Sequence, residues 1–203
     1  MTSEKKIILW DNQSCPYAQR AWLTLVEKEI PFETKLVDLK NKSEEFKALY
    51  ASIHPDPEAP AKVPILEDTD GTKLIESLTV ARYLDAKYPE RPLMPKSPAD
   101  VAKIELFLEY FMPAAFGGVF AFLKADTRAA VEELIPGLVK NLKIANTTLE
   151  RYGSTEGGDY FLGGFYSLAD VAASPHIFRM IHGLKGLRGV DYMGLIQEHK
   201  LDR

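Results

Sequence analysis

The sequence predicts an α/β domain followed by an all-helical domain, and three observations lead to this fold class. Strand and helix patterns alternate over residues 5–88, a charged proline-rich stretch follows at 89–97, and no strand pattern recurs afterwards. We therefore assign a first domain to residues 1–88, a linker to 89–97 and a second domain to 98–203. A chain of 203 residues is long enough to hold two such domains.

The first half opens with a strand, a helix and a second strand. Residues 7–10 form a continuous apolar run, which is typical of a parallel strand buried on both faces. Residues 16–29 have a helical period, and residues 32–37 alternate between apolar and polar side chains. The connecting helix makes the two strands parallel. The apolar stripe expected to face the sheet consists of Ala18, Trp22, Leu25 and Val26.

The rest of the first half is expected to hold a helix, a hairpin and a covering helix. The expected elements are a helix over 43–50, strands over 63–66 and 72–75, and a helix over 77–87. Asp70 and Gly71 mark the hairpin turn, and the prolines of residues 54–60 forbid regular structure before it. One parallel βαβ unit followed by an antiparallel hairpin and a helix is the thioredoxin-like arrangement.

Helical periods dominate the second half. Apolar residues between positions 101 and 112 fit one helical face, and residues 128–152 predict a long helix. Ser167 opens a third helix, and the residues beyond 186 leave room for one short helix.

Charge and composition exclude several classes of function. The formal net charge is −4 and no block of lysine or arginine occurs, so a surface that follows nucleic-acid phosphates is not expected. No apolar stretch is expected to approach the length that spans a membrane, and the run at 7–10 is too short for a signal peptide. The chain is therefore expected in the cytoplasm, or in an organelle if a transit peptide has been removed. The four histidines show no metal-ligand spacing, so no metal is expected.

The single cysteine, Cys15, lies between the first strand and the first helix. One cysteine excludes an internal disulfide and a cysteine-rich zinc site, and its plainest interpretation is a small buried apolar side chain. Its context favours a reactive role instead. Pro16 suits the first position of a helix, which makes Cys15 the N-cap. Free backbone N–H groups and the positive end of the helix stabilise a thiolate there.

The chain lacks the second cysteine of a dithiol oxidoreductase, because Ala18 occupies that position. With no other cysteine present, a mixed disulfide at Cys15 has to be resolved by a thiol from outside the chain. The residues therefore predict monothiol exchange with a small-molecule thiol.

Two dipeptides further along the chain suit a peptide-like ligand. Pro64 occupies a place where this fold typically has a cis-proline, and Val63 could then pair with a ligand backbone as an added strand. The simpler interpretation is the start of an edge strand. Ser77 is expected to cap the next helix, where it could bind a carboxylate, while Glu76 could accept from an ammonium. Helix capping alone is the alternative for this pair.

With these motifs in this order, the chain resembles the cytosolic glutathione transferases, and among them the cysteine-using omega and lambda classes. The segments that carry the resemblance are residues 15–20, 38–42, 62–67, 76–77, 83–85, 161–164 and 167–170. The last of these matches the family's capping box, in which Asp170 accepts from the Ser167 N–H, and that element is structural. The resemblance implies the glutathione-transferase fold with a short C-terminal end.

The resemblance also implies an enzyme with glutathione as its co-substrate. The activity would be that of a thioltransferase or reductase, acting by thiol–disulfide exchange, dehydroascorbate reduction or deglutathionylation. Cys15 would form the mixed disulfide with glutathione. The residues implied to bind glutathione are Lys42 at the glycyl end, Val63 with Pro64 at the cysteinyl backbone, and Glu76 with Ser77 at the γ-glutamyl group.

A substrate pocket is implied between the two domains. Its expected lining is Tyr17, Phe107, Tyr110, Phe111, Phe165 and Tyr166, although an ordinary core position is the plainer interpretation for each. The chain departs from the family in a longer proline-rich loop at 54–61 and in a shorter C-terminal end, so the pocket is expected to be open.

Other functions stay open at this point. The chain could carry hydrophobic small molecules in that pocket without catalysis, or Ser14 could support glutathione conjugation. Membrane insertion, as in chloride-channel-like members of the superfamily, has little support from the apolar stretches. The expected partners are glutathione and small electrophilic or oxidised substrates, and a monomer and a homodimer both fit the family.

Overall fold

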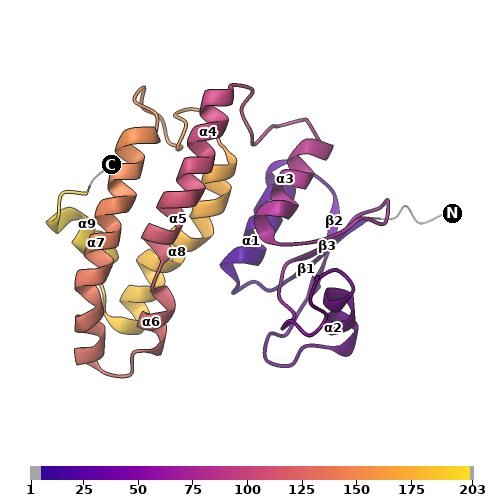
Figure 1. Cartoon of the computed structure of the whole chain (residues 1–203), viewed down its shortest axis with the longest axis horizontal. Helices are drawn as coiled ribbons and strands as arrows, with labels where there is room; N and C mark the ends of the chain where they lie inside the picture. The colour runs from indigo at the N-terminus through magenta and orange to yellow at the C-terminus, as the bar shows by residue number, and fades with distance from the viewer. Residues whose placement is uncertain (1–5, 202–203) are drawn as a thin grey trace. The chain divides into compact units, whose positions relative to one another are not determined.

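The structure, a computed structural model, describes residues 6–201. The chain folds as two compact units, and the boundary between them lies at Pro92 and Leu93, inside the segment assigned to the linker (Figure 1). The first unit mixes strands and helices, and the second is built of helices. The predicted fold class is therefore confirmed.

The first unit is built around a four-stranded sheet. Its elements are β1 (Ile7–Asp11), α1 (Pro16–Glu27), β2 (Phe32–Leu36), α2 (Glu44–Ala51), β3 (Ile65–Glu67), β4 (Lys73–Ile75) and α3 (Ser77–Lys87). The strand order is β2-β1-β3-β4, with β1 parallel to β2 and the other pairs antiparallel. The predicted βαβ unit, hairpin and covering helix are all present.

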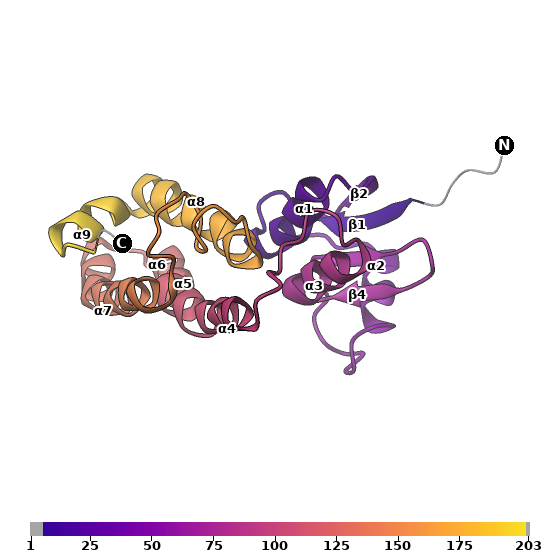
Figure 2. The same cartoon turned by 90° about the horizontal axis from the view of Figure 1, so that it is seen from above.

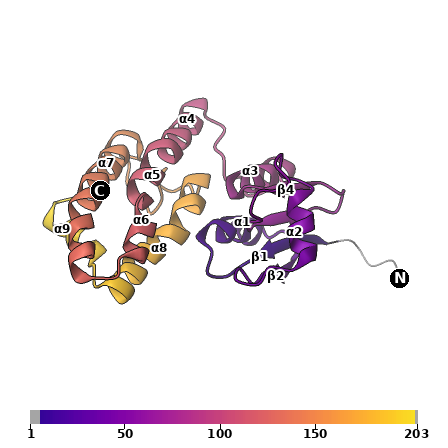
Figure 3. The same cartoon turned by 60° about the horizontal axis from the view of Figure 1, so that its bottom comes forward.

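Helices pack on both faces of this sheet, with α1 and α2 on opposite sides (Figure 3). Alternate residues of β1 divide between the faces, because successive side chains of a strand point in opposite directions. Leu9 packs with the side chains of α1 and α3, whereas Trp10 packs with Phe46 and Tyr50 of α2. Burial on both faces explains why β1 is a continuous apolar run.

The expected apolar stripe of α1 is wrong in two of its four residues. Ala18 and Leu25 are fully buried, but Trp22 is 37% exposed and Val26 is 44% exposed. The buried face is centred on Ala21 and extends toward the polar residues Thr24 and Arg20. Trp22 and Val26 therefore lie beyond the edge of the face that contacts the sheet.

The second unit consists of helices, with one longer loop at residues 153–167. Its elements are α4 (Pro98–Leu106), the π-helical segment η1 (Phe107–Phe111), α5 (Met112–Phe116), α6 (Val119–Lys124), α7 (Arg128–Tyr152), α8 (Leu168–Arg188) and α9 (Tyr192–Glu198). The helices of this unit form two layers, with α8 on one side and α4, α5 and α7 on the other (Figure 2). The long helix at 128–152 and the short helix after residue 186 are both confirmed.

The predicted capping box at the start of α8 is present. Asp170 Oδ2 accepts from the Ser167 backbone N–H at 2.8 Å and from the Ser167 hydroxyl at 2.7 Å. Its other oxygen, Oδ1, accepts from the Phe161 N–H at 2.9 Å. One carboxylate thus closes the first turn of α8 and holds the preceding loop against it.

One run of the second unit contradicts the expectation that no apolar stretch approaches a membrane-spanning length. The helical run Pro98–Lys124 is long and apolar enough to cross a membrane by length and composition alone. Core helices of soluble proteins pass the same test, and this run contributes Ile104, Phe107 and Phe111 to the buried residues of its unit. It is weak evidence for a membrane span.

Candidate functional site

Cys15 lies at the start of α1, directly after the loop that leaves β1. It is the N-cap, with Pro16 at the first helical position, as the sequence predicts. The side chain makes no capping hydrogen bond, is half-buried and packs against the cluster that contains Val63 and Phe46. Cys15 thus lies where a helix leaves its first backbone N–H groups without intrahelical partners, with its side chain against the apolar cluster.

Asn12 holds the loop that presents Cys15. Its Nδ2 donates to the Val37 carbonyl at 2.9 Å, and its own carbonyl accepts from the Cys15 N–H at 2.9 Å. Its Oδ1 accepts from the Ser14 N–H at 3.0 Å and from the Ser14 hydroxyl at 2.5 Å. Because side-chain and backbone atoms of Asn12 are all engaged, the position of the cysteine is set by several bonds.

Arg20 is a site residue to which the sequence patterns assigned no role. Its side chain is buried one helical turn beyond Cys15, with Nη1 3.5 Å from Ser77 Oγ and the guanidinium carbon 5.1 Å from the centre of the Tyr17 ring. Burial lowers the pKa of Arg20 to about 10, while Tyr17 and Cys15 act in the opposite direction. In the sequence, the one sign that Arg20 could have a role was its position as a charged residue beside the apolar stripe of α1.

Val63 and Pro64 lie in the stretch that leads into β3. The peptide bond between them is cis, as expected, and both residues are buried. Val63 belongs to the same cluster that Cys15 packs against. The fold thus brings two of the expected site residues together from positions 48 residues apart in the chain, 15 and 63.

Glu76 and Ser77 begin α3 in a different way from the one expected. Glu76, not Ser77, is the N-cap, and Ser77 is the first helical residue and is buried. Glu76 has a φ of 67° and a ψ of 110°, a conformation that costs a non-glycine residue about 1–3 kcal/mol. Such strain is typical of functional positions. The burial of Tyr50 and the charge of Glu76 both raise the pKa of Tyr50.

Lys42 lies between β2 and α2 and is half-buried. It directly precedes Ser43, whose hydroxyl accepts from the Phe46 N–H at 3.2 Å and caps α2. Its expected role at the glycyl end of glutathione stays a prediction.

The aromatic residues expected at the substrate pocket have different environments. Tyr17 is 44% exposed on α1. Phe107 and Phe111 are buried and stack with ring centres 4.4 Å apart, whereas Tyr110 is 50% exposed. Phe165 and Tyr166 are half-buried in the loop before α8, where the Tyr166 ring meets Tyr160 edge-on at 5.1 Å. The substrate-pocket role of these residues stays a prediction.

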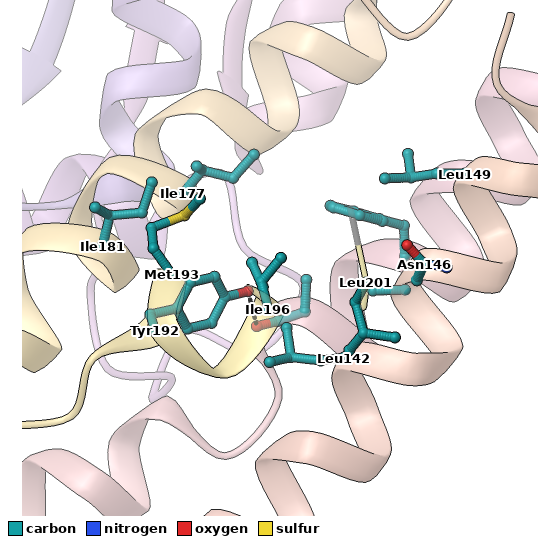
Figure 4. Close-up of a pocket in the computed structure, with 12 residues that line it drawn as sticks. Leu142, Asn146, Leu149, Ile177, Ile181, Tyr192, Met193, Ile196 and Leu201 are labelled. Atoms are coloured by element: carbon teal, nitrogen blue, oxygen red, sulfur yellow. Dashed lines mark hydrogen bonds between the residues drawn. The ribbon is translucent and has the colours of Figure 1, made fainter. Parts of the chain in front are cut away.

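The helical unit contains an apolar pocket of its own, with a volume of about 160 Å³ (Figure 4). Side chains of α7 face those of α8 and α9 across it. The residues labelled in Figure 4 are Leu142, Asn146, Leu149, Ile177, Ile181, Tyr192, Met193, Ile196 and Leu201. The Tyr192 hydroxyl donates to the Ala115 carbonyl at 3.5 Å, and burial raises the pKa of Tyr192. This pocket offers no group suited to acid–base chemistry near neutral pH.

Metal chemistry has no visible ligand set in the part of the chain that the structure describes. No group of three or more histidine, cysteine, aspartate or glutamate side chains is arranged to hold a metal ion within residues 6–201.

The sequence and the fold of this chain are similar to those of known proteins. Residues 14–87 match the family model for the glutathione S-transferase N-terminal domain. The chain is 30% identical to glutathione S-transferase omega-1 of Rattus norvegicus over 177 residues, which cover 87% of this chain and 68% of the rat protein. It is 32% identical to pyrimidodiazepine synthase of Drosophila melanogaster over 91% of this chain and 68% of that protein.

A solved structure shows the same similarity. The crystal structure of glutathione transferase Omega 3C from Trametes versicolor superposes with a TM-score of 0.72 at 25% sequence identity. The match covers 95% of this chain and 76% of the Trametes chain, so it includes both units.

Proposed function

Because this chain belongs to the glutathione transferase family and resembles its omega-class members, we propose that it is a glutathione-dependent thioltransferase that works through a mixed disulfide between Cys15 and glutathione. The observation that carries the proposal is the position of the chain's only cysteine. Its sulfur lies at the N-cap of α1, where it makes no capping hydrogen bond of its own. Cys15 is a free and half-buried cysteine, so its sulfur is available for thiol–disulfide exchange.

The proposed reaction consists of two exchanges. The Cys15 thiolate attacks the glutathionyl sulfur of an oxidised substrate, so the Cys15–glutathione bond forms while the substrate disulfide breaks. The substrate leaves as a thiolate and takes a proton from water. A glutathione thiolate then attacks the bound glutathionyl sulfur, releasing glutathione disulfide and the Cys15 thiolate. Because the chain has no other cysteine, external glutathione supplies the second thiol. Dehydroascorbate brings no glutathionyl group, so its reduction would consume two molecules of glutathione. Their thiols would supply two electrons and two protons to give ascorbate and would leave joined as glutathione disulfide.

The proposed glutathione contacts follow the strands and helix ends of the first unit. Val63 would pair with the cysteinyl backbone, since it lies against the cluster that holds Cys15. Ser77 and the first turn of α3 would bind the γ-glutamyl carboxylate, and Glu76 would accept from the ammonium. Lys42 would pair with the glycyl carboxylate.

Conjugation through Ser14 is the weaker alternative. A conjugating serine has to donate its hydroxyl proton to the glutathione thiolate. The Ser14 hydroxyl instead donates to Asn12 Oδ1 at 2.5 Å, in the bond that helps hold the loop. This engagement favours Cys15 over Ser14 as the residue that meets the glutathione sulfur.

The test compares wild type with Cys15→Ser and Cys15→Ala for the formation of a glutathione adduct and for thioltransferase activity. Wild type treated with glutathione disulfide is expected to gain one glutathionyl group by intact mass and to reduce a glutathionyl–cysteine disulfide. Both variants are expected to lose the adduct and the activity. Ser14→Ala removes only one of the several bonds that hold the loop before Cys15, so it is expected to keep the adduct and most of the activity. Full exchange activity in Cys15→Ala contradicts the proposal. Tight binding of a hydrophobic ligand with no adduct on wild type favours a non-catalytic carrier.

We also propose that the enzyme works in the cytoplasm, because a free thiolate persists where glutathione keeps thiols reduced. A homodimer and a monomer both fit the family resemblance, and a homodimer is the assembly that we propose to test. Sedimentation at two protein concentrations distinguishes it from a monomer.

A further inference from the structure

The first unit contains a pocket between α1 and the strands β1 and β2. Its volume is about 360 Å³. The lining residues are Asp11, Gln13, Gln19, Trp22, Thr34 and Leu36. None of them is among the residues that the proposed glutathione chemistry uses.

Asp11 is the unusual member of this lining. Its side chain is at the last position of β1 and the residue is only 5% exposed, yet Oδ1 has no hydrogen-bond partner. The backbone of Asp11 is engaged, because its carbonyl accepts from the Val37 N–H at 2.8 Å. Burial raises the pKa of Asp11, and a hydrogen bond from the Asn12 backbone opposes this. A buried carboxylate oxygen without a partner destabilises a fold unless a ligand satisfies it.

The rest of the lining indicates what such a ligand would be. The lining contains two carboxamides and a hydroxyl but no lysine, arginine or histidine, so nothing in it balances the charge of an anion. Trp22 and Leu36 are 37% and 66% exposed, which leaves apolar surface beside the acid. A cation with an apolar body complements both features, because an ammonium pairs with the carboxylate and an aromatic face attracts a cation.

We propose that this pocket binds an organic ammonium with a small aromatic or aliphatic body, with the ammonium on Asp11 and the body on Trp22 and Leu36. The site is separate in its residues from the proposed glutathione site, and the proposal does not depend on the activity of Cys15. It also explains the wrong prediction for α1, because Trp22 is exposed at the pocket instead of buried against the sheet.

Three probes of one shape test the charge requirement. Benzylammonium, benzyl alcohol and benzoate share a phenyl ring and differ in the group that would meet Asp11. Each is titrated into the full chain while the indole N–H resonance of Trp22 is followed by NMR, with Trp22→Phe used to assign it. Trp10 is an internal reference, because its indole N–H donates to Glu67 at 2.8 Å. Only benzylammonium is expected to shift the Trp22 resonance saturably. Equal shifts with all three, or none with benzylammonium, overturn the proposal.

Asp11→Asn tests the role of the carboxylate. It is expected to abolish the benzylammonium response and to raise the melting temperature of the free protein, because it removes a buried charge that no cation of the pocket lining balances. Asp38→Asn is the matched control, since it removes the same charge from an exposed position of the same unit and should change neither. A retained response in Asp11→Asn contradicts the proposal. If that variant does not fold, the comparison of the three probes on wild type still decides the question.

Discussion

The guanidinium of Arg20 is buried in the first unit with its Nη1 3.5 Å from the Ser77 hydroxyl oxygen. This contact joins α1, which Cys15 caps, to the start of α3, where Glu76 has its strained backbone. The two helix ends proposed to bind the sulfur and the γ-glutamyl group are thus connected through one buried cation. Burial lowers the pKa of Arg20, and the interactions of its charge with Tyr17 and Cys15 oppose this effect.

Replacing Arg20 should therefore alter the reactivity of Cys15. In Arg20→Met the attraction of the site for an anionic reagent is lost, and a nearby buried charge contributes on the order of 1 kcal/mol, about fivefold in rate. The ratio of Cys15 alkylation rates by iodoacetate and iodoacetamide is expected to fall by about that factor. Arg20→Lys keeps the charge and should keep most of the ratio. An unchanged ratio in Arg20→Met shows that Arg20 is only structural.

Lys28 makes a second buried link between α1 and α3. Its Nζ lies 2.8 Å from Asp85 Oδ1 and donates to the carbonyls of Glu90 and Arg91 at 2.9 and 3.0 Å. Lys28→Met leaves the Asp85 carboxylate buried without this cation and is expected to lower the free energy of unfolding by about 3–5 kcal/mol. The double variant Lys28→Met with Asp85→Leu should recover much of this loss. Urea unfolding measures the free energy of unfolding of both variants. If the double variant loses as much as Lys28→Met, the buried charge of Asp85 is not the cause of the loss.

The sequence was sufficient to place Cys15 but not the residues around it. Cys15 and Pro16 are adjacent, and proline has a strong local preference for the first helical position, so the N-cap could be predicted. The side chain of Arg20 contacts Ser77, which is 57 residues away in the sequence. A helical pattern relates only residues within a few turns of one another, so it could not predict this contact.

Backbone conformation was equally hard to predict at the start of α3. Ser77 is the better capping residue by preference, yet Glu76 takes the N-cap with a positive φ. The local preference is overridden where tertiary structure holds a strained residue. The wrong assignments at Trp22 and Ser77 both concern candidate binding residues, which is where local rules are expected to fail.

The hairpin turn between β3 and β4 should make stability depend on pH. Asp68 Oδ2 accepts from Tyr83 at 2.6 Å and from Lys87 at 2.7 Å. Burial raises the pKa of Asp68, but the bonds from Lys87, Tyr83 and Thr69 together lower it below its ordinary value of 3.8. The carboxyl of Asp68 thus binds a proton more readily in the unfolded chain than in the folded one. Its contribution to stability is therefore complete at pH values above 3.8 and is lost as the pH falls toward the pKa of the folded state.

Asp68→Asn should show this dependence directly. Its urea midpoint is expected to be lower than that of wild type at about pH 7, and the difference should shrink as the pH approaches about 3. Asp56→Asn, in the exposed loop after α2, is a suitable control. A difference that stays constant over this range rules out the protonation of Asp68 as its source.

The carboxylate of Asp170 accepts hydrogen bonds from three donors. It accepts from the N–H and the hydroxyl of Ser167 and from the Phe161 N–H. Asp170→Ala therefore removes the acceptor of donors at the start of α8 and in the preceding loop. We expect a loss of roughly 2–3 kcal/mol in the free energy of unfolding. Ser97→Ala is the matched control, because Ser97 caps α4 through a single bond to the Asp100 N–H at 3.3 Å and should cost about 1 kcal/mol. Thermal unfolding followed by circular dichroism separates the two. If Asp170→Ala loses no more than Ser97→Ala, the carboxylate acts as a simple cap and its bond to Phe161 contributes nothing measurable.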